Sequence, residues 1–352
     1  MTVSSADSAE ETPLIEETLG RIAAGEDLSM DDASRAIEAI MLGLCADAEI
    51  GLLLSGLRLK GETVEEIAGA AAALRRHMTP IRSHRQGIVD TCGTGGDGSA
   101  TFNISTAAAL VAAAAGVPVA KHGNRRVTST CGSADVLAVL GVNIEADVRL
   151  VESCLDELGI CFCFAPLLHG AMKHVARVRQ QLATPTIFNL LGPLSNPAGA
   201  PFQLLGVGRP ELRPVMAAAL ALLGIERAVV VCGEDGLDEV TLSGVTKVTE
   251  VRAGKIREFT WHPNDFGIEP CGLEDLRVSG PEESATMIRN VLAGHGGPQR
   301  DIVVLNAAAA LWTAGRAAQP AEGASLAAAA IDSGAAAALL ARLAEKTNVP
   351  RQ

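Results

Sequence analysis

A glycine-rich turn carries the strongest chemical signal in this sequence. Residues 90–98 read DTCGTGGDG and complete the short apolar run IVDTC, after which a helix is expected from about residue 105 to 115. Glycine tolerates positive φ and lets backbone amides approach a ligand closely, and a helix start adds N–H groups without internal partners. Asn103, Ser105 and Thr106 place side-chain donors at that start. The segment therefore predicts an anion site, most often one for phosphate.

The same turn fits the dinucleotide pattern G-x-G-x-x-G through Gly93, Gly95 and Gly98, so a dehydrogenase is an alternative. A dinucleotide site needs an acidic residue about 20 residues further on, after the next strand. This chain has the cationic run KHGNRR there, at residues 121–126, which suits several phosphate oxygens. The pattern GxxxxGK[ST] is missing, which excludes an ATPase P-loop. A tight turn without a ligand is the remaining alternative.

Hydroxyl groups continue the basic loop, because residues 128–135 read TSTCGSAD. They can donate hydrogen bonds to phosphate without adding charge, and Ser133 is also suited to cap the next helix. The sequence shows no base partner for Cys131, which disfavours a nucleophilic thiol.

An acidic pair, Asp238 and Glu239, lies in the turn GEDGLDE after the apolar strand AVVVC. Turns at the carboxyl ends of strands are common ligand sites in α/β sheets. Adjacent carboxylates repel one another unless a cation lies near them, and Mg²⁺ typically bridges one or two carboxylates to substrate phosphates. Beside a phosphate site the pair predicts magnesium, whereas alone it would indicate a solvated acidic turn.

Two arginines on the expected helix over residues 171–180 are candidates for binding a carboxylate. Arg177 and Arg179 are two positions apart and so point to different faces of the helix. One of them could hold a carboxylate through a bidentate pair, and the residues alone leave that choice open. His122, His169 and His174 lack metal-ligand spacing such as HExxH, so we expect structural or donor roles for them.

The elements that position these residues fall into two groups. Capping sequences such as TVEE at residues 63–66 precede helical runs, and no strand-like run interrupts the chain before about residue 83. Strands then alternate with helices, which predicts an α/β domain with a mostly parallel central sheet. We expect a disordered tail at 1–12, a small all-helical N-terminal domain at 13–84 and the larger α/β domain at 85–352.

Composition narrows the possible partners of this chain of 352 residues. A net charge of −12 and an aromatic content of 3% argue against nucleic acid and against anionic membrane. No stretch is apolar enough for a bilayer span, and the polar, acidic start is unlike a secretory signal, so we expect a cytoplasmic protein. Eight cysteines without a CxxC pair support neither a disulfide scaffold nor a zinc site.

Together, several motifs resemble the anthranilate phosphoribosyltransferase family: CGTGGD and TFNIST, KHGNR, GSADVL, AMKHVARVR, TIFNLLGPLSNPA and DGLDEVTL. The resemblance runs from about Leu14 nearly to the C-terminus. It implies a nucleoside phosphorylase-like fold whose helical domain also includes helices near 170–185, an active site at the hinge, and a homodimer. It implies transfer of phosphoribosyl from 5-phosphoribosyl 1-diphosphate (PRPP) to the amino group of anthranilate, releasing pyrophosphate, in tryptophan biosynthesis.

The resemblance also assigns roles to residues. The catalytic roles fall to Lys121, Asn124, Arg125 and Arg179. The magnesium ligands would be Ser105, Asp238 and Glu239. Gly93, Asn124 and Arg179 match anthranilate contacts, which selects Arg179 over Arg177. The full set expected to bind the two substrates is Gly93, Gly96, Asp97, Thr101, Asn103, Ile104, Ser105, Thr106, Lys121, His122, Gly123, Asn124, Arg125, Arg126, Val127, Thr128, Ser129, Ser133 and Arg179.

Some positions depart from the family pattern. Arg126 replaces a small residue, Thr128 and Cys131 replace serine, and Gly170 and Pro185 replace commoner residues, which leaves side-chain details near the basic loop open. Two further alternatives share the architecture: a pyrimidine-nucleoside phosphorylase, which needs no Mg²⁺, and a non-catalytic nucleic-acid-binding relative. The acidic pair and the GTGGD…NIST string favour the transferase.

Overall fold

The computed structural model describes residues 7–125 and 131–349, with side chains from Ile15 onward. Four helices open the chain: α1 (Asp7–Ala23), α2 (Met30–Leu42), α3 (Asp47–Lys60) and α4 (Val64–Arg76). Local chemistry fixes their ends. Thr63 and Glu66 form the predicted capping box of α4, and Gly43 ends α2 with φ 77°.

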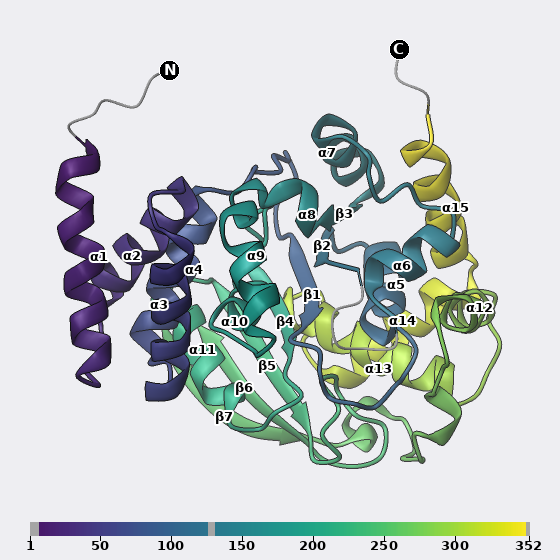
Figure 1. Ribbon diagram of the computed structural model, residues 1–352. Helices are drawn as coiled ribbons and strands as arrows, with labels where there is room; N and C mark the ends of the chain where they lie inside the picture. The colour runs from purple at the N-terminus through teal and green to yellow at the C-terminus, as the bar shows by residue number, and fades with distance from the viewer. Residues whose placement is uncertain (1–6, 126–130, 350–352) are drawn as a thin grey trace.

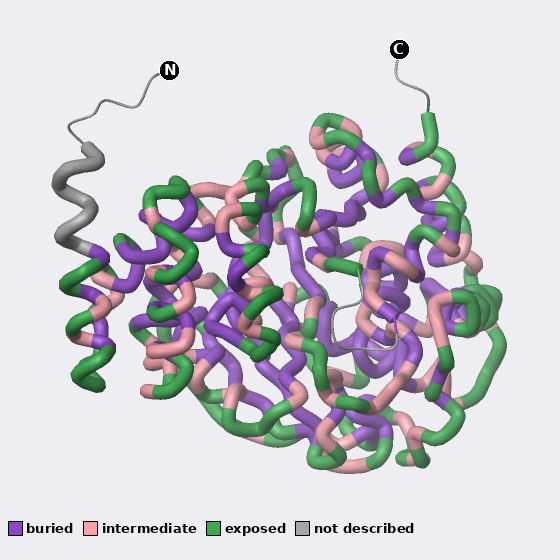
Figure 2. The backbone as a smooth tube through the Cα atoms, viewed as in Figure 1, coloured by how far each residue is buried: buried purple, intermediate pink, exposed green. Residues whose placement is uncertain are grey.

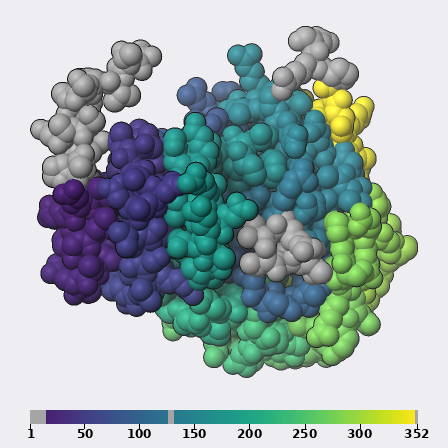
Figure 3. Space-filling view, viewed as in Figure 1, coloured from purple at the N-terminus to yellow at the C-terminus, as the bar shows by residue number. Residues whose placement is uncertain are grey.

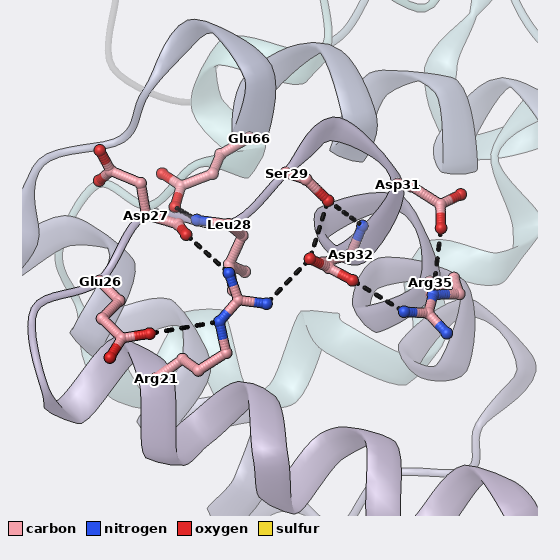
Figure 4. Close-up of polar contacts among 9 residues, drawn as sticks. All are labelled: Arg21, Glu26, Asp27, Leu28, Ser29, Asp31, Asp32, Arg35 and Glu66. Atoms are coloured by element: carbon pink, nitrogen blue, oxygen red, sulfur yellow. Dashed lines mark hydrogen bonds and ion pairs between the residues drawn. The ribbon is translucent and has the colours of Figure 1, made fainter.

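Polar contacts fasten α1 to α2 (Figure 4). The Arg21 guanidinium donates a 2.9 Å hydrogen bond to Asp32. Asp32 also accepts hydrogen bonds from Arg35 and from Ser29, which is the N-cap residue of α2. The pKa of Asp32 therefore lies well below its usual range. Across the bundle, the buried Glu66 carboxylate accepts a 2.9 Å hydrogen bond from the Leu28 amide. These contacts join α1 to α2, and the segment before α2 to α4.

The rest of the chain forms a seven-stranded sheet in the order β3-β2-β1-β4-β5-β6-β7 (Figure 1). Strands β1 to β5 pair in parallel, and β6 and β7 add an antiparallel hairpin that turns at Ala253 and Gly254, both at positive φ. The predicted mostly parallel sheet is therefore confirmed. The strands are β1 (Val89–Gly93), β2 (Val119–Gly123), β3 (Ile160–Phe164), β4 (Phe202–Gly206), β5 (Arg227–Gly233), β6 (Thr246–Arg252) and β7 (Lys255–Trp261).

Helices cover both faces of the sheet, as parallel strands require. In the described part of the chain they are α5 (Ile104–Ala114), α6 (Ser133–Val139), α7 (Val148–Leu158), α8 (Ala165–Leu168), α9 (Lys173–Leu182), α10 (Phe188–Leu191), α11 (Leu212–Leu222), α12 (Pro281–Leu292), α13 (Pro298–Thr313), α14 (Pro320–Asp332) and α15 (Ala335–Thr347). Short 3₁₀ turns lie at η1 (Gly170–Met172), η2 (Pro263–Phe266) and η3 (Glu274–Leu276).

Buried apolar residues form two hydrophobic cores, one on each face of the sheet. Figure 2 shows the buried segments in purple through the middle of the molecule, with exposed segments in green around them. Alternate residues of a strand enter opposite cores, so that Leu204 joins the core around α5 and α13 while Leu205 joins the other. The second core also contains Leu53 of α3 and Val175 of α9. The helical domain, with α9 and α10, therefore shares one continuous apolar interior with a face of the sheet.

No single helix in the described ranges is long and apolar enough to cross a membrane. The pair α14 and α15, which bends by 64° at its break, meets that test only jointly, by length and composition.

Close packing of α2 against α4 generates a stability test. A Cβ at Gly69 would overlap the carbonyl oxygen of Met30, whereas a Cβ at the exposed Gly20 of α1 would meet nothing within 4 Å. We expect Gly69→Ala to lower the free energy of unfolding by about 1–3 kcal/mol. Gly20→Ala, its matched control, should raise that free energy by about 0.5–1 kcal/mol. Urea unfolding measures both, and equal effects of the two substitutions would refute this account of the α2–α4 contact.

Candidate active site

Most of the predicted site residues in the described ranges line one cavity of about 580 Å³ at the carboxyl ends of β1 and β2. The loop after β5 closes the cavity from the side. Sites at this end of a parallel sheet are typical of α/β proteins. The predicted residues that line it are Gly93, Gly96, Asp97, Thr101, Asn103, Ile104, Ser105, Lys121, His122, Gly123, Asn124, Arg125, Ser133, Asp238 and Glu239.

The glycine turn brings backbone into close contact with the acidic loop. The Gly95 amide donates a 2.9 Å hydrogen bond to Asp238, and Gly95 and Gly96 adopt φ of 66° and 78°. A Cβ at Gly93 would overlap the Asp238 carboxylate. Glycine is therefore required at Gly93 by the close approach, and at its neighbours by the left-handed backbone.

The start of α5 supplies the opposite wall. The Ser105 amide donates a 3.0 Å hydrogen bond to Glu239, as expected of a free N–H in the first turn of a helix. Asn103 is fixed in turn by Ser284 and by the Cys131 thiol, each of which donates a 3.0 Å hydrogen bond to its side-chain oxygen. Thr106 does not line the cavity, because its side chain is buried within the fold.

Asp238 and Glu239 place two carboxylates side by side in this cavity. Each residue keeps part of its surface exposed. Both carboxylates nevertheless lie deep in the cavity, where protein surrounds them. Burial raises the pKa of Asp238, and the nearby Asp97 carboxylate raises it further. Burial and Asp238 likewise raise the pKa of Glu239, while Lys121 opposes that shift. Both carboxylates therefore bind a proton more readily here than in water, and a cation beside them would favour their charged form.

This donor set fits magnesium. Two carboxylates and the Ser105 hydroxyl are hard oxygen ligands, and Mg²⁺ commonly takes its remaining ligands from water and substrate phosphate. The described residues contain no cluster of three or more His, Cys, Asp or Glu that could hold a metal ion. Ser105, Asp238 and Glu239 therefore suit an ion that arrives with a phosphate ligand.

Lys121 is the buried cation of the site. Its ammonium donates to the Thr91 carbonyl at 2.5 Å and to the Ser105 hydroxyl at 3.2 Å. Burial lowers its pKa, and the Asp90 carboxylate opposes that shift. Asp90 in turn accepts a 3.1 Å hydrogen bond from the His122 amide. The sheet thus holds Lys121 close to the helix start that would bind phosphate.

Beyond Lys121, the basic loop is described only in part. Asn124 and Arg125 line the cavity, and the Arg125 guanidinium lies 3.4 Å from each of two carboxylates, Asp135 and Glu145. It also lies 5.7 Å from the centre of the Phe164 ring. The remaining predicted residues of this loop lie outside the described residues, namely Arg126, Val127, Thr128 and Ser129.

The two arginines of α9 point apart, as their spacing indicates. Arg177 forms a 2.8 Å ion pair with Asp47 on the surface of α3. Arg179 donates a 3.3 Å hydrogen bond to Asn189, and its guanidinium lies 5.5 Å from the centre of the Phe188 ring. Arg179 does not line the cavity. The teal segment that includes α9 lies between the purple N-terminal helices and the rest of the molecule (Figure 3).

Several positions that support the site carry no motif in the sequence. A Cβ at Gly206 would overlap the Asp238 carbonyl, and one at Gly208 would lie 2.9 Å from Cα of Asp97. Nothing in the sequence around these two glycines distinguishes them from glycines at the end of an ordinary strand. Asn306 of α13 clamps Val240, next to the acidic pair, through two hydrogen bonds of 2.9 Å. A single asparagine within the apolar run VVLNAAAALW was a usable signal for that role.

A buried histidine pair joins the sheet to the segment before α9. The Nε2 atoms of His122 and His169 lie 3.2 Å apart, and His122 Nδ1 lies 3.1 Å from the Gly192 carbonyl oxygen. Since a carbonyl only accepts, Nδ1 of His122 carries the proton and its Nε2 accepts from His169. Burial lowers the pKa of His122 to about 3 and that of His169 to about 4.

Both domains match models of a glycosyl transferase family: the helical bundle domain at residues 16–78 and the a/b domain at residues 85–337. This defines the class of protein, and the relatives narrow it. The anthranilate phosphoribosyltransferase of Rhodospirillum rubrum is 54% identical over 325 residues, which cover 92% of this chain and 93% of the relative. That of Rhodopirellula baltica is 52% identical over 321 residues, covering 91% and 94%.

Solved structures agree with these relatives. The crystal structure of anthranilate phosphoribosyltransferase from Thermus thermophilus superposes with a TM-score of 0.88 at 43% identity, covering 94% of this chain and 99% of that one. The enzyme of Saccharomyces cerevisiae, solved in complex with PRPP and Mg, superposes with a TM-score of 0.85 at 30% identity, covering 98% of each chain. The chain therefore belongs to the anthranilate phosphoribosyltransferase family, which confirms the resemblance and disfavours the dehydrogenase and phosphorylase alternatives.

The histidine pair predicts a pH dependence of stability. In the unfolded chain each histidine has an ordinary pKa near 6.5 and binds a proton before the folded protein does. The neutral histidine pair stabilises the folded protein fully above about pH 6.5. This contribution to the free energy of unfolding falls as the pH drops toward 4, by up to about 1.4 kcal/mol per pH unit for each histidine. We expect the free energy of unfolding of His169→Gln, measured with urea, to change less with pH over this window than that of the native protein. The exposed His295→Gln is the control, and identical slopes for the two variants would contradict the prediction.

Proposed function

We propose that this chain transfers the phosphoribosyl group of PRPP to the amino group of anthranilate, giving N-(5-phosphoribosyl)anthranilate and pyrophosphate in tryptophan biosynthesis. The observation that carries this proposal is the acidic pair Asp238 and Glu239, which faces the glycine turn and Lys121 across one cavity. Membership of the family supports the choice of substrates, since relatives bear the name of this activity and a yeast structure contains PRPP and Mg.

The chain's own groups suit the departure of pyrophosphate. Negative charge grows on the leaving oxygens as the bond to C1 of the ribose breaks. Amides of the glycine turn, Lys121 and Arg125 line the cavity and would stabilise that charge, at about 3–4 kcal/mol for each well-placed donor. Ser105, Asp238 and Glu239 would hold Mg²⁺, which when bound neutralises phosphate oxygens.

The acceptor step needs positioning more than proton abstraction. The amino group of anthranilate is already neutral at pH 7, and it attacks C1 from the face opposite the leaving group, inverting that centre. Correct placement of two reactants is worth about 7–11 kcal/mol. Asn124 and Gly93 line the cavity where the acceptor would enter. Arg179 would hold the anthranilate carboxylate once α9 and the cavity approach each other.

A turnover assay tests the proposal as a whole. Purified protein, anthranilate, PRPP and Mg²⁺ are mixed, and loss of anthranilate fluorescence is followed while each component is omitted in turn. We expect turnover only in the complete mixture. Turnover of a pyrimidine nucleoside with inorganic phosphate, and none of anthranilate, would replace this proposal with the phosphorylase alternative.

The role of Arg179 is tested by splitting the two Michaelis constants. A charged hydrogen bond contributes about 1.5–3 kcal/mol, so Arg179→Ala should raise KM for anthranilate roughly 10- to 100-fold and KM for PRPP less than twofold. Arg177→Ala removes a neighbouring surface charge paired with Asp47 and serves as the control. Equal increases in both constants for Arg179→Ala would remove this residue from the acceptor site.

We further propose a homodimer formed through the helical domains. Large apolar side chains are exposed on α2, α3 and the turn between them: Leu42, Leu44, Leu52 and Leu59, the last two 64% and 87% exposed. Leu52 and Leu59 are seven residues apart and lie on one face of α3. Grouped exposure of this kind is typical of an interaction surface.

Light scattering of the purified protein tests this interface. Leu52→Glu with Leu59→Glu should convert a dimer into a monomer without loss of helical circular dichroism, because two charges would be buried without partners. Ile256→Glu changes a similarly exposed apolar residue on β7 and should leave the dimer intact. A dimer that survives the double substitution would place the interface elsewhere.

A cytoplasmic location is proposed from the same role. All eight cysteines fall within the described ranges, where none of them forms a disulfide, and five of them are buried. Reduced thiols are typical of reducing compartments, where tryptophan biosynthesis would supply the substrates.

A further inference from the structure

A second cavity, of about 330 Å³, lies at the opposite ends of the central strands. It is bounded by the amino ends of β1 and β4, by the turn before β5 and by the end of α4. The active-site cavity lies at the carboxyl ends of β1 and β2, so the two have no lining residue in common. The polar and charged side chains that line it are Arg75, Asp90, Asn196, Gln203 and Glu226.

Arg75 brings a cation to this cavity without a carboxylate partner. Its Nε donates a 2.6 Å hydrogen bond to the Leu194 carbonyl, and no Asp or Glu oxygen in the described ranges lies within 4.0 Å of the guanidinium. Burial lowers the pKa of Arg75, which reflects the loss of water around the charge. A charge in this position is costly unless an anion compensates it. The terminal nitrogens of the guanidinium are therefore suited to a bidentate anion.

The other polar groups of the cavity floor are mostly used within the protein. The Gln203 side-chain amide donates a 2.6 Å hydrogen bond to the Pro193 carbonyl, and the Asn196 amide donates a 2.8 Å hydrogen bond to the Ala120 carbonyl. Asp90 is fully buried, and its carboxylate accepts a hydrogen bond from the His122 amide. Met78, Pro193, Pro201, Leu223 and Ile225 form the apolar part of the walls. Glu226 also lines the cavity, but it is exposed and forms no ion pair with Arg75 within the described ranges.

We propose that this cavity binds a small organic carboxylate with a compact apolar body. Arg75 would hold the carboxylate, and the apolar walls would enclose the body. The volume lies within the range of small-molecule sites, about 300–1,000 Å³. Inorganic anions share the charge but would leave the apolar walls without contacts.

Crystals soaked in 4-bromobenzoate, together with calorimetric titration, test the site directly. We expect anomalous bromine density between Leu223 and Ile225, and a second binding event in solution that Arg75→Met weakens at least tenfold. Arg179→Ala should leave this second binding event unchanged, because Arg179 lies in the proposed acceptor site and does not line this cavity. The two variants therefore separate failure of this inference from failure of the proposed function.

Competing ligands and a second variant complete the test. Acetate and phosphate should bind at least tenfold more weakly than 4-bromobenzoate, since neither fills the apolar walls. Ala200→Leu narrows the cavity without touching the guanidinium and should weaken 4-bromobenzoate by a similar margin, which decides the matter if Arg75→Met unfolds. Bromine density confined to the active site, or affinity unchanged in either cavity variant, would overturn the proposal.

Discussion

The crowding of negative charge at one end of the sheet is the constraint on which the site depends. Asp238, Glu239 and Asp97 lie together in a cavity where burial raises the pKa of the first two. Backbone amides of the glycine turn and of α5, with the buried Lys121, offset only part of this charge. A bound diphosphate would add more negative charge, so this cavity favours a substrate that arrives with a divalent cation.

The residues proposed to bind PRPP and the arginine proposed to bind anthranilate lie in different parts of the fold. The cavity proposed to bind PRPP lies at the carboxyl ends of β1 and β2. Arg179, in contrast, lies on α9, which packs with the N-terminal helices. The Arg179 side chain donates a hydrogen bond to Asn189, lies over the Phe188 ring and does not line the cavity. The His122–His169 pair and the shared apolar core connect the two parts. The acceptor role proposed for Arg179 would require α9 to approach the cavity, which is the reason for expecting an active site at a hinge.

Much of this arrangement follows from local signals in the sequence. The alternation of strands and helices predicts the mostly parallel sheet, and the glycine turn, Lys121 and the acidic pair meet in one cavity as their positions at strand ends require. Other features depend on tertiary contact. Gly206 and Gly208 matter because other segments pack against them, and Thr106 turns into the interior although Ser105 beside it lines the cavity. The orientation of Arg179 depends on Asn189, which a helical pattern does not reveal.

Calorimetric titration of PRPP against rising Mg²⁺ tests the central claim most directly. It compares the native protein with a double variant, Asp238→Asn with Glu239→Gln, which keeps side-chain size and removes two negative charges. The account predicts that PRPP binds the native protein tightly only with Mg²⁺. The variant should lose that dependence and bind PRPP without metal more tightly than the native protein does. The same Mg²⁺ dependence in both proteins would contradict the claim that this charge governs the site.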